Sequence, residues 1–471
     1  MKRKRLLGVA ASLAVASFAA LTFTGCGSST SSTSSTGTTA NGATMVVTAG
    51  DAPLNSILSA NVTVSGISLT PSGGGSDVTV LSTSRTIELS SLGAIQEPIE
   101  TENVAAGTYS AVNITVSSAT VTYVDSTGQV VTGTATINSP TDTVTLNSAL
   151  TVTQGQDVHL SLNFNLAQSF DLSGSTLTFT PSITSAAAAI EQESEAEREV
   201  EVTGSVVSIN STSITVQSAG TGVQSTFAIN SSTQFSASLS AGSIQPGSIV
   251  TVQGTVQTDG TLLAMMISAS MNGDAMSSSQ GGGSGIVTAV TRDGSGNVTS
   301  FMFVAREDFG DMTSTSPLTV ALASSTVYGV SQDAVQAGVA ATAFTNAEIF
   351  PGQSVAVIGT MGSGGTIAAQ EVDLAAESLA GSLSMAPQGT APTYTFTLQL
   401  PTESFLTTYE SLSALTATTS AETEYEDGLT ASGFGSMAAG TNVEVHGYLL
   451  VDSSNNYSLA VSNVSQISSD N

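Results

Sequence analysis

Apolar residues at every second position constrain this chain more than any other feature of its sequence. In residues 158–164 every even position is apolar, and residues 112–116 repeat the pattern. Turn sequences at 73–75 and 125–128 separate such runs. Period-two spacing between turns is typical of half-buried antiparallel strands. It predicts an all-β fold, with a β-sandwich of about seven or eight strands in residues 45–184.

Three related segments follow the predicted sandwich. Each contains a turn glycine, then a strand, then a second glycine, and the turn glycines are Gly247, Gly352 and Gly440. Their long and uneven spacing indicates duplicated domains with loop insertions, not a solenoid. Short strands with glycine at their bends predict small barrels, in which the sheet closes on itself and exposes no long edge.

Two family resemblances support this division of the chain. The segments GDAPL at 50–54 and VAAGTY at 104–109 resemble domain-of-unknown-function family 4382 of bacterial lipoproteins. That resemblance implies a transthyretin-like sandwich that serves as a binding or spacer module. The segment PGSIVTVQGT at 246–255, with counterparts at 351–360 and 439–448, resembles domain-of-unknown-function family 5666. That resemblance implies small OB-like barrels, a fold that often binds oligonucleotides or oligosaccharides.

Residues 1–26 have the order of an export signal: a basic start, an apolar run over 6–23, and a small pair before Cys26, the single cysteine. They resemble a bacterial lipoprotein signal, which implies lipidation of Cys26. Gly27 implies sorting to the outer membrane. A plain signal peptide and an uncleaved membrane helix are the alternatives.

Charge excludes several functions. Four of the eight basic residues lie within residues 2–5, so the rest of the chain has four arginines and no lysine among 36 acidic residues. Schiff-base chemistry and a Walker-type phosphate loop both need a lysine that this part of the chain lacks. Nucleic-acid binding needs clustered basic residues, so the composition predicts no nucleic-acid partner.

The predicted boundaries follow the changes in composition. In chain order the segments are a lipoprotein signal (1–26), a Ser/Thr/Gly tether (27–44), the sandwich (45–184), an acidic linker (185–201), barrel 1 (202–270), a Gly/Ser linker (271–284), barrel 2 (285–376) and barrel 3 (377–471). The acidic linker is expected to be either a short solvated helix or disordered, because Ala and Glu dominate it.

Candidate sites are few. Asp293, Ser295 and Asn297 place oxygen side chains at alternate positions, as a calcium loop does, although a hairpin turn explains the same pattern. Calcium is therefore the one cofactor that the sequence leaves open. The acidic run at 422–427 is expected to be a solvated loop and not a metal site.

The two histidines and the aromatic residues of barrel 3 offer no stronger candidate. His159 and His446 alternate with apolar neighbours, so both are expected on solvated strand faces. Tyr394 and Phe396 are expected in a strand core. The sequence contains no Gly-x-Ser-x-Gly, Gly-x-Gly-x-x-Gly or His-Glu-x-x-His motif, so no catalytic or cofactor-binding residue is predicted.

These observations predict a non-catalytic envelope lipoprotein, anchored through acylated Cys26, that acts as a binding or structural module. The expected partners are the lipid bilayer, a polysaccharide, a calcium-bridged surface or an envelope protein, without nucleic acid. The alternative is a hydrolase whose active site is assembled from distant loops.

Overall fold

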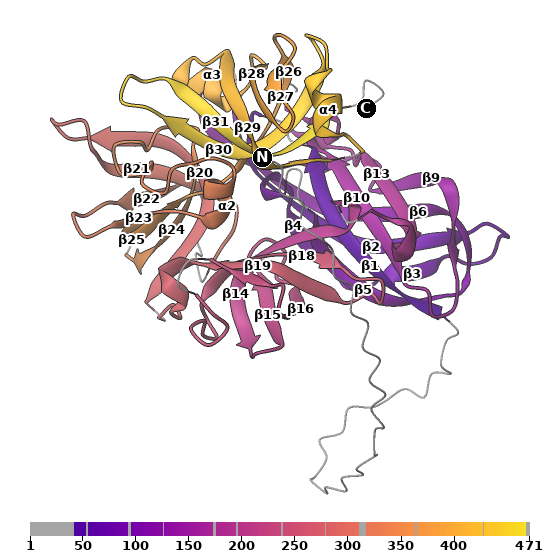
Figure 1. Cartoon of the computed structure of the whole chain (residues 1–471). Helices are drawn as coiled ribbons and strands as arrows, with labels where there is room; N and C mark the ends of the chain where they lie inside the picture. The colour runs from indigo at the N-terminus through magenta and orange to yellow at the C-terminus, as the bar shows by residue number, and fades with distance from the viewer. Residues whose placement is uncertain are drawn as a thin grey trace, which may run out of the picture. The chain divides into compact units, whose positions relative to one another are not determined.

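The computed structural model describes residues 42–467, apart from 53–54, 93–95, 126, 173–175, 195, 237–238, 278, 310–316, 363–364 and 427. Nearly all of its secondary structure is strand, which confirms the all-β prediction (Figure 1). Cys26 and most of the predicted tether lie outside the described residues. None of the described helices is both long and apolar enough to cross a membrane.

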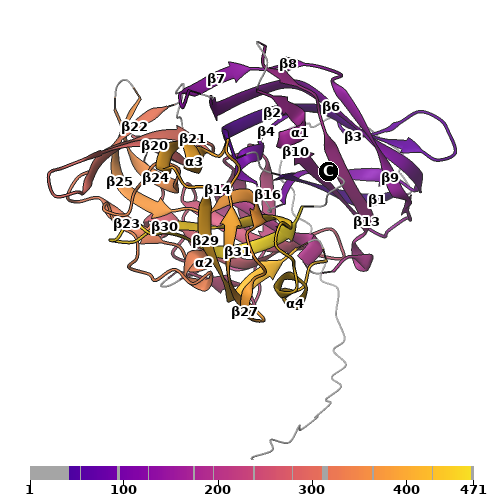
Figure 2. The same cartoon turned by 90° about the horizontal axis from the view of Figure 1, so that it is seen from above.

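The first domain is a sandwich of two main sheets (Figure 2). One sheet has the order β13-β10-β1-β5, with β13 Ile183–Ala189, β10 Val158–Asn165, β1 Gly42–Ala52 and β5 Glu97–Ala105. The other has β2 (Ile57–Pro71) and β6 (Gly107–Val124) at its centre, flanked by β3 (Val78–Leu81), β4 (Arg85–Glu88), β7 (Val130–Thr134) and β9 (Thr141–Val152). A small third sheet joins β11 (Phe170–Asp171), β12 (Thr178–Phe179) and β8 (Thr136–Ile137).

The sandwich core forms where the apolar faces of its two main sheets meet. Met45 and Leu160 from one sheet and Val62 and Ile114 from the other are fully buried in a single cluster. Burial of one face of each sheet is what the period-two pattern predicted.

Each of the three following domains is a closed five-stranded ring. Barrel 1 contains β14 (Glu199–Ile209), β15 (Ser213–Ser218), β16 (Gln224–Ala228), β18 (Ile249–Val256) and β19 (Leu262–Ala269), with β17 (Gln234–Phe235) added to β19. Its ring runs β14-β15-β16-β19-β18 and returns to β14.

Barrel 2 repeats that ring strand for strand. It contains β20 (Gln280–Arg292), β21 (Val298–Ala305), β22 (Leu318–Ala321), β24 (Ser354–Met361) and β25 (Thr366–Leu374), with β23 (Val327–Val330) added to β25. Barrel 3 closes as β26-β28-β29-β31-β30, with β26 Glu377–Leu383, β28 Thr393–Gln399, β29 Ala414–Tyr425, β31 Tyr457–Gln466 and β30 Asn442–Val451. The hairpin strand β27 (Gln388–Thr390) adds to β28.

The repeated turn glycine has the same role in all three barrels. Gly247, Gly352 and Gly440 have φ values of 88°, 93° and 84°, a backbone region that favours glycine. Each donates its backbone N–H at 2.7 Å to the carbonyl of the barrel's first strand, at Val206, Val287 and Leu383 respectively. The sequence repeat therefore encodes a repeated turn that fastens the fourth strand of each barrel to the first.

Three predicted boundaries differ from the structure. Strand β1 begins at Gly42, inside the predicted tether, and β20 begins at Gln280, inside the predicted Gly/Ser linker. The first part of the acidic linker continues β13, which pairs with β10 over its whole length. Among the described residues, two 3-10 turns follow, at Ile190–Gln192 and Ala196–Arg198. In each case, pairing with a neighbouring strand outweighs the weak preference of the local sequence for a loop or a helix.

The second repeated glycine generates a stability prediction. Gly254 lies at a break in the β18–β19 register, where a Cβ would meet the carbonyl oxygen of Leu263 and the ring of Phe227. We expect Gly254→Ala to destabilise barrel 1 by about 2 kcal/mol, because the backbone must move to accept the methyl group. Thermal unfolding checks this against Gly73→Ala, a site where the added Cβ meets no atom within 4 Å. Equal melting temperatures for the two variants would contradict it.

Candidate functional site

Contacts between neighbouring domains join the four β-domains in a closed series. The first and last domains meet at Asn55, whose side-chain amide donates to the Ala380 carbonyl at 2.7 Å and accepts from the Ala380 N–H at 3.0 Å. Each of the other three junctions includes a hydrogen bond between domains: Thr221 to Glu97 at 2.7 Å, Ser270 to Asp373 at 3.3 Å, and Gln353 to the Leu449 carbonyl at 2.9 Å.

One junction contains a buried ion pair. The Arg306 guanidinium, just after β21, binds both carboxylate oxygens of Glu377 on β26, at 2.8 and 3.1 Å. Its Nε donates to the Leu58 carbonyl of the sandwich at 2.7 Å. The two charged side chains are 5% and 2% exposed. Glu88, buried at the end of β4, also faces this guanidinium, and burial raises the pKa of Glu88.

All four arginines outside the N-terminal segment bind groups within the chain. Arg85 pairs with Glu100 at 3.2 Å, and Arg198 donates to the Val256 carbonyl at 2.8 Å. Arg292 donates to backbone carbonyls that include Ile349, at 2.8 Å. The described arginines therefore bind groups of the chain itself and stabilise its fold.

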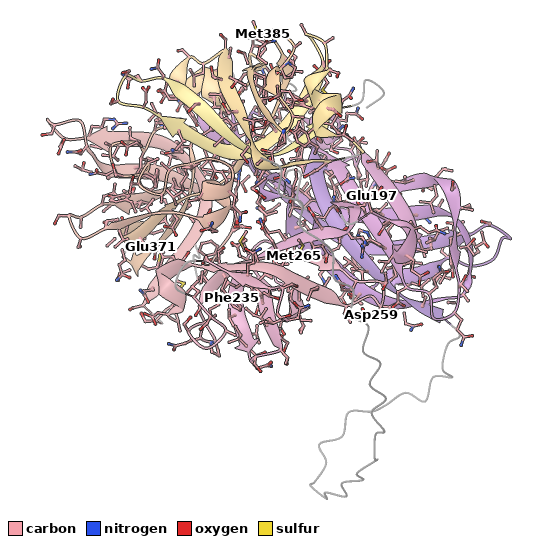
Figure 3. The ribbon with its side chains drawn as sticks, in the orientation of Figure 1. Glu197, Phe235, Asp259, Met265, Glu371 and Met385 are labelled. Carbon is pink, nitrogen blue, oxygen red and sulfur yellow. The ribbon has the colours of Figure 1, made fainter. Side chains whose placement is uncertain are left out.

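A cavity of about 1460 Å³ lies among the four domains. Twelve of the residues that line it are Asp or Glu, and its described lining contains no Lys or Arg. Side-chain amides such as Gln96, Asn163 and Gln253 occupy much of the remaining wall. Figure 3 labels two of the acidic lining residues, Glu197 and Glu371, together with Met265, one of the exposed apolar side chains.

The cavity brings together carboxylates that are far apart in sequence. Glu201 of barrel 1 has a pKa raised to about 8 by burial and by the charge of Asp333. Asp333 of barrel 2 has a pKa raised to about 6 by burial and by Glu424 of barrel 3. Burial and the adjacent Glu371 raise the pKa of Asp373 to about 7. Carboxyl groups from three domains thus face the same cavity. Repulsion between their negative charges disfavours ionisation of all of them at once.

The calcium candidate is a hairpin turn. Asp293 Oδ1 accepts the backbone N–H groups of Ser295 and Asn297, at 2.8 and 3.0 Å, and these hydrogen bonds lower the pKa of the Asp293 carboxyl. Within the described part of the chain, no group of three or more His, Cys, Asp or Glu side chains is arranged to hold a metal ion. The carboxylate oxygens of Asp293 therefore stabilise the turn.

The acidic run at 422–427 is largely strand instead of the predicted loop, and Glu422 and Glu424 are exposed to solvent as predicted. Most of it continues strand β29, and both Glu424 and Glu426 line the cavity. Their carboxylates accept from the Asn463 amide at 3.1 and 2.7 Å. Tyr394 and Phe396 are 6% and 2% exposed, in the core of barrel 3, as predicted.

The prediction that both histidines lie on solvated faces is wrong. His159 is 0% exposed and His446 is 8% exposed. The alternating pattern correctly placed each histidine ring on the strand face that points away from the apolar core. The acidic linker covers the first ring through Glu193, and β26 covers the second through Ser378, whose hydroxyl lies 2.7 Å from His446 Nδ1.

The hydrolase alternative requires a nucleophile, a base and an orienting acid in one place. Burial and the nearby Arg306 lower the pKa of His446 to about 4, which matches general-base catalysis near neutral pH poorly. His159 contacts Thr48, but that hydroxyl is fully buried and donates its proton to Gln96. Neither histidine is therefore placed to activate an accessible nucleophile.

Few features of the sequence indicated the Arg306 junction or the cavity. Arg306 follows the alternating strand β21 directly and is one of only four arginines after residue 5, and this rarity was the available signal. No sequence pattern identified the carboxylates of the cavity, because nothing in the sequence distinguishes them from the other acidic residues among the 36.

The fold and the cavity define a class of protein: an all-β chain that joins a sandwich to three closed barrels around an acidic space. Residues 42–181 match the family described as "Domain of unknown function (DUF4382)". Residues 203–268 and 407–455 match "Domain of unknown function (DUF5666)". These matches confirm the family resemblances drawn from the sequence for the sandwich and for barrels 1 and 3, and they do not include barrel 2 or the N-terminal segment. No curated protein matches this chain.

Two solved structures with similarity to this chain are a deletion mutant and the wild-type form of the single-stranded DNA binding protein from Thermus aquaticus. Both are 14% identical to it, with TM-scores of 0.17 and 0.16. The matches cover 41% and 40% of this chain and 95% and 92% of those chains. The prediction excluded nucleic acid, whereas both neighbours are single-stranded DNA binding proteins, and the comparisons do not support the predicted bilayer, polysaccharide or envelope-protein partners. At such TM-scores they carry no argument about what this chain binds.

Removal of the buried guanidinium should be strongly destabilising. Arg306→Met leaves Glu377 and Glu88 buried without their counter-charge, so we expect a loss of about 3–5 kcal/mol in urea unfolding. The double variant Arg306→Met/Glu377→Met should recover much of that loss. Arg85→Met is the matched control, because the partly exposed Arg85–Glu100 pair should contribute at most about 1 kcal/mol. Equal losses for the two arginine variants would show that burial of the pair is unimportant.

Stability should fall as the pH rises. Burial raises the pKa of Glu97 from 4.5 to about 7, so this carboxyl binds a proton more strongly in the folded chain than in the unfolded chain. Its contribution is fully present below pH 4.5 and is lost as the pH rises to about 7. We expect Glu97→Gln to remove about 3 kcal/mol of this pH dependence, at 1.36 kcal/mol per pKa unit.

Urea unfolding across that pH range measures the effect. Glu102→Gln is the control, because Glu102 is exposed on the same strand. If Glu97→Gln and the wild type lose stability in parallel, the assignment to Glu97 is wrong.

Proposed function

We propose that this chain is an exported, non-catalytic binding protein whose four β-domains enclose the site of a cationic, donor-rich ligand such as a polyamine. The observation that carries the proposal is the cavity of about 1460 Å³, lined by twelve carboxylates and several amides. The predicted location at the cell envelope is part of the proposal and rests on the N-terminal segment.

The charge of the cavity supports this class of ligand. Glu201, Asp333 and Glu424 come from three different barrels and repel one another. One carboxylate oxygen of Asp333 has no hydrogen-bond partner among the described residues, although it is buried. A ligand with several ammonium groups would supply positive charge to these carboxylates and an N–H donor to the Asp333 oxygen that lacks one.

The lining favours polar recognition over stacking. Amide and hydroxyl side chains line the cavity together with the carboxylates, and Tyr425 and Tyr448 are among its few aromatic residues. A flexible polyamine can place its amines at carboxylates on different walls. Its affinity should depend strongly on ionic strength, because salt screens charge pairs that solvent can reach.

Spermidine is the first ligand to test. Thermal unfolding of the purified protein should show a rise in melting temperature with spermidine, since a ligand that binds only the folded state stabilises it by about 2.7 kcal/mol at 100 times its Kd. The double variant Glu201→Gln/Asp333→Asn should lose most of the ligand-induced rise, because it removes two of the converging carboxyl groups that an ammonium group would bind. Magnesium chloride at equal ionic strength measures general screening.

The control variant removes two acids elsewhere on the surface. Glu102→Gln/Glu403→Gln removes the same number of acidic groups, at exposed positions outside the cavity lining. It should keep the full spermidine response. A response that is equal in both double variants, or equal for magnesium and spermidine, would overturn the proposal.

A further inference from the structure

Four polar side chains meet on one face of the sheet β13-β10-β1-β5, the face that points away from the sandwich core. Thr48 lies on β1, His159 and Ser161 lie on β10, and Gln96 comes just before β5. The register places Thr48 beside Ser161 and Val46 beside His159. Thr48 and His159 are fully buried, whereas Gln96 is partly buried and lines the cavity. A hydroxyl, an imidazole and a carboxamide are therefore brought together at the cavity wall.

The Thr48 hydroxyl lies between two acceptors. Its Oγ1 is 2.8 Å from Gln96 Oε1 and 2.9 Å from His159 Nε2. The other ring nitrogen, Nδ1, lies 3.2 and 3.1 Å from the two carboxylate oxygens of Glu193. When Nδ1–H donates to this carboxylate, the Nε2 lone pair can accept the hydroxyl hydrogen, which turns toward it by rotation about the Thr48 Cβ–Oγ1 bond. Glu193, His159 and Thr48 thus have the order of orienting acid, base and nucleophile.

The Gln96 carboxamide is the electrophile that this hydroxyl faces. Its Oε1 also accepts from the Ser161 hydroxyl at 3.2 Å, and its Nε2 donates to Asn163 Oδ1 at 2.7 Å. A Cβ at Gly50 would clash with Gln96 Nε2, so glycine at this position lets the amide approach β1 closely. The amide oxygen and nitrogen are thus held in fixed directions. When the Thr48 hydrogen turns to the ring, the Ser161 hydroxyl remains to stabilise negative charge on Oε1.

We propose that Thr48 and Gln96 form an intramolecular ester cross-link in the folded chain. Thr48 Oγ1 attacks the carbonyl carbon of the Gln96 side chain, and His159 Nε2 takes the hydroxyl proton. The C–N bond of the tetrahedral intermediate then breaks, the imidazolium gives the proton to the leaving nitrogen, and ammonia departs. One alcohol and one primary amide become one ester and one ammonia, so the reaction needs no oxidant and no second reactant.

The position of the groups favours the forward reaction. An ester is less stable than an amide between free molecules, but a hydroxyl held against an amide acts at an effective concentration on the order of 10⁵ M or more. Gln96, Ser161 and Asn163 line the cavity, so the ammonia leaves into that space and not into a packed core. Burial prevents Thr48 from attacking an external substrate, but it does not prevent attack on a neighbour that is already in place.

The cross-link would fasten the first strand of the sandwich. Thr48 and Gln96 are 48 positions apart, so the bond closes a loop that contains β2, β3 and β4. After residue 5 the chain has no lysine, and Cys26 is its single cysteine, so neither a lysine isopeptide bond nor a disulfide can form within this part of the chain. A bond between a hydroxyl and an amide is a covalent closure that the composition still permits.

Peptide mapping of the purified full chain tests the proposal. Cleavage after glutamate separates the two residues, because Glu88 lies between them. The expected product is a branched peptide that contains both Thr48 and Gln96 and is lighter than its two linear parts by one ammonia, about 17 Da. Hydroxylamine, which cleaves esters, should release two peptides from it. Separate linear peptides in the wild type, or Gln96 hydrolysed to glutamate, would overturn the proposal.

Variants test the role of each group in the reaction. Thr48→Val keeps the shape of the side chain but removes the nucleophile, so no branched peptide should form. His159→Gln should slow its formation about 100-fold, measured at time points after cell-free synthesis of the full chain, because the base is lost. His446→Gln is the matched control, because it removes the other buried histidine, in barrel 3, and should leave the rate unchanged. The wild-type map decides the proposal even if His159→Gln does not fold.

Glu193 acts through the ring and is therefore a positioning residue. Glu193→Gln should slow formation of the branched peptide, because an amide stabilises the imidazolium less than a carboxylate does. Glu193→Asp should restore part of the rate, which a purely structural role of the side chain would not explain. If Glu193→Gln and His159→Gln both form the branched peptide at the wild-type rate, the proposed mechanism is wrong.

Discussion

Burial of a guanidinium is unfavourable unless its N–H donors find acceptors, and Arg306 meets that condition only where three domains come together. Glu377 of barrel 3 supplies two acceptor oxygens, and the Leu58 carbonyl of the sandwich supplies a third. If any of these domains separated from the others, a charged side chain would be exposed to solvent or left buried without its partner. The ion pair therefore selects one arrangement of the domains, and the apolar cluster that Leu58 shares with barrels 2 and 3 supplies most of the attraction.

The architecture could be predicted from the sequence because it rests on local patterns. Alternation over residues 158–164 fixes a strand and its buried face, and the turn glycines at 247, 352 and 440 mark the same turn three times. Both signals act within a few residues. They hold even for barrel 2, which has the same ring of strands although the family matches cover only parts of barrels 1 and 3.

The site could not be predicted because polar side chains form it, and the sequence pattern places polar residues equally on exposed strand faces and in loops. Alternation shows that His159 faces away from the core of its sheet, but it does not show that Glu193 covers it. The alanine run of β13 has strong helix propensity, yet the open edge of β10 determines its conformation. Tertiary contacts thus determined the conformations that the sequence patterns had assigned to solvent-exposed segments.

The scarcity of basic residues links these features. Each arginine after residue 5 neutralises a carboxylate or binds backbone carbonyls at a particular place, so no arginine or lysine reaches the described cavity lining. Carboxylates such as Glu201 and Asp333 must then be neutralised by something else, and protons or a bound cation are the two means available. Protons and ligand therefore compete for the same oxygens.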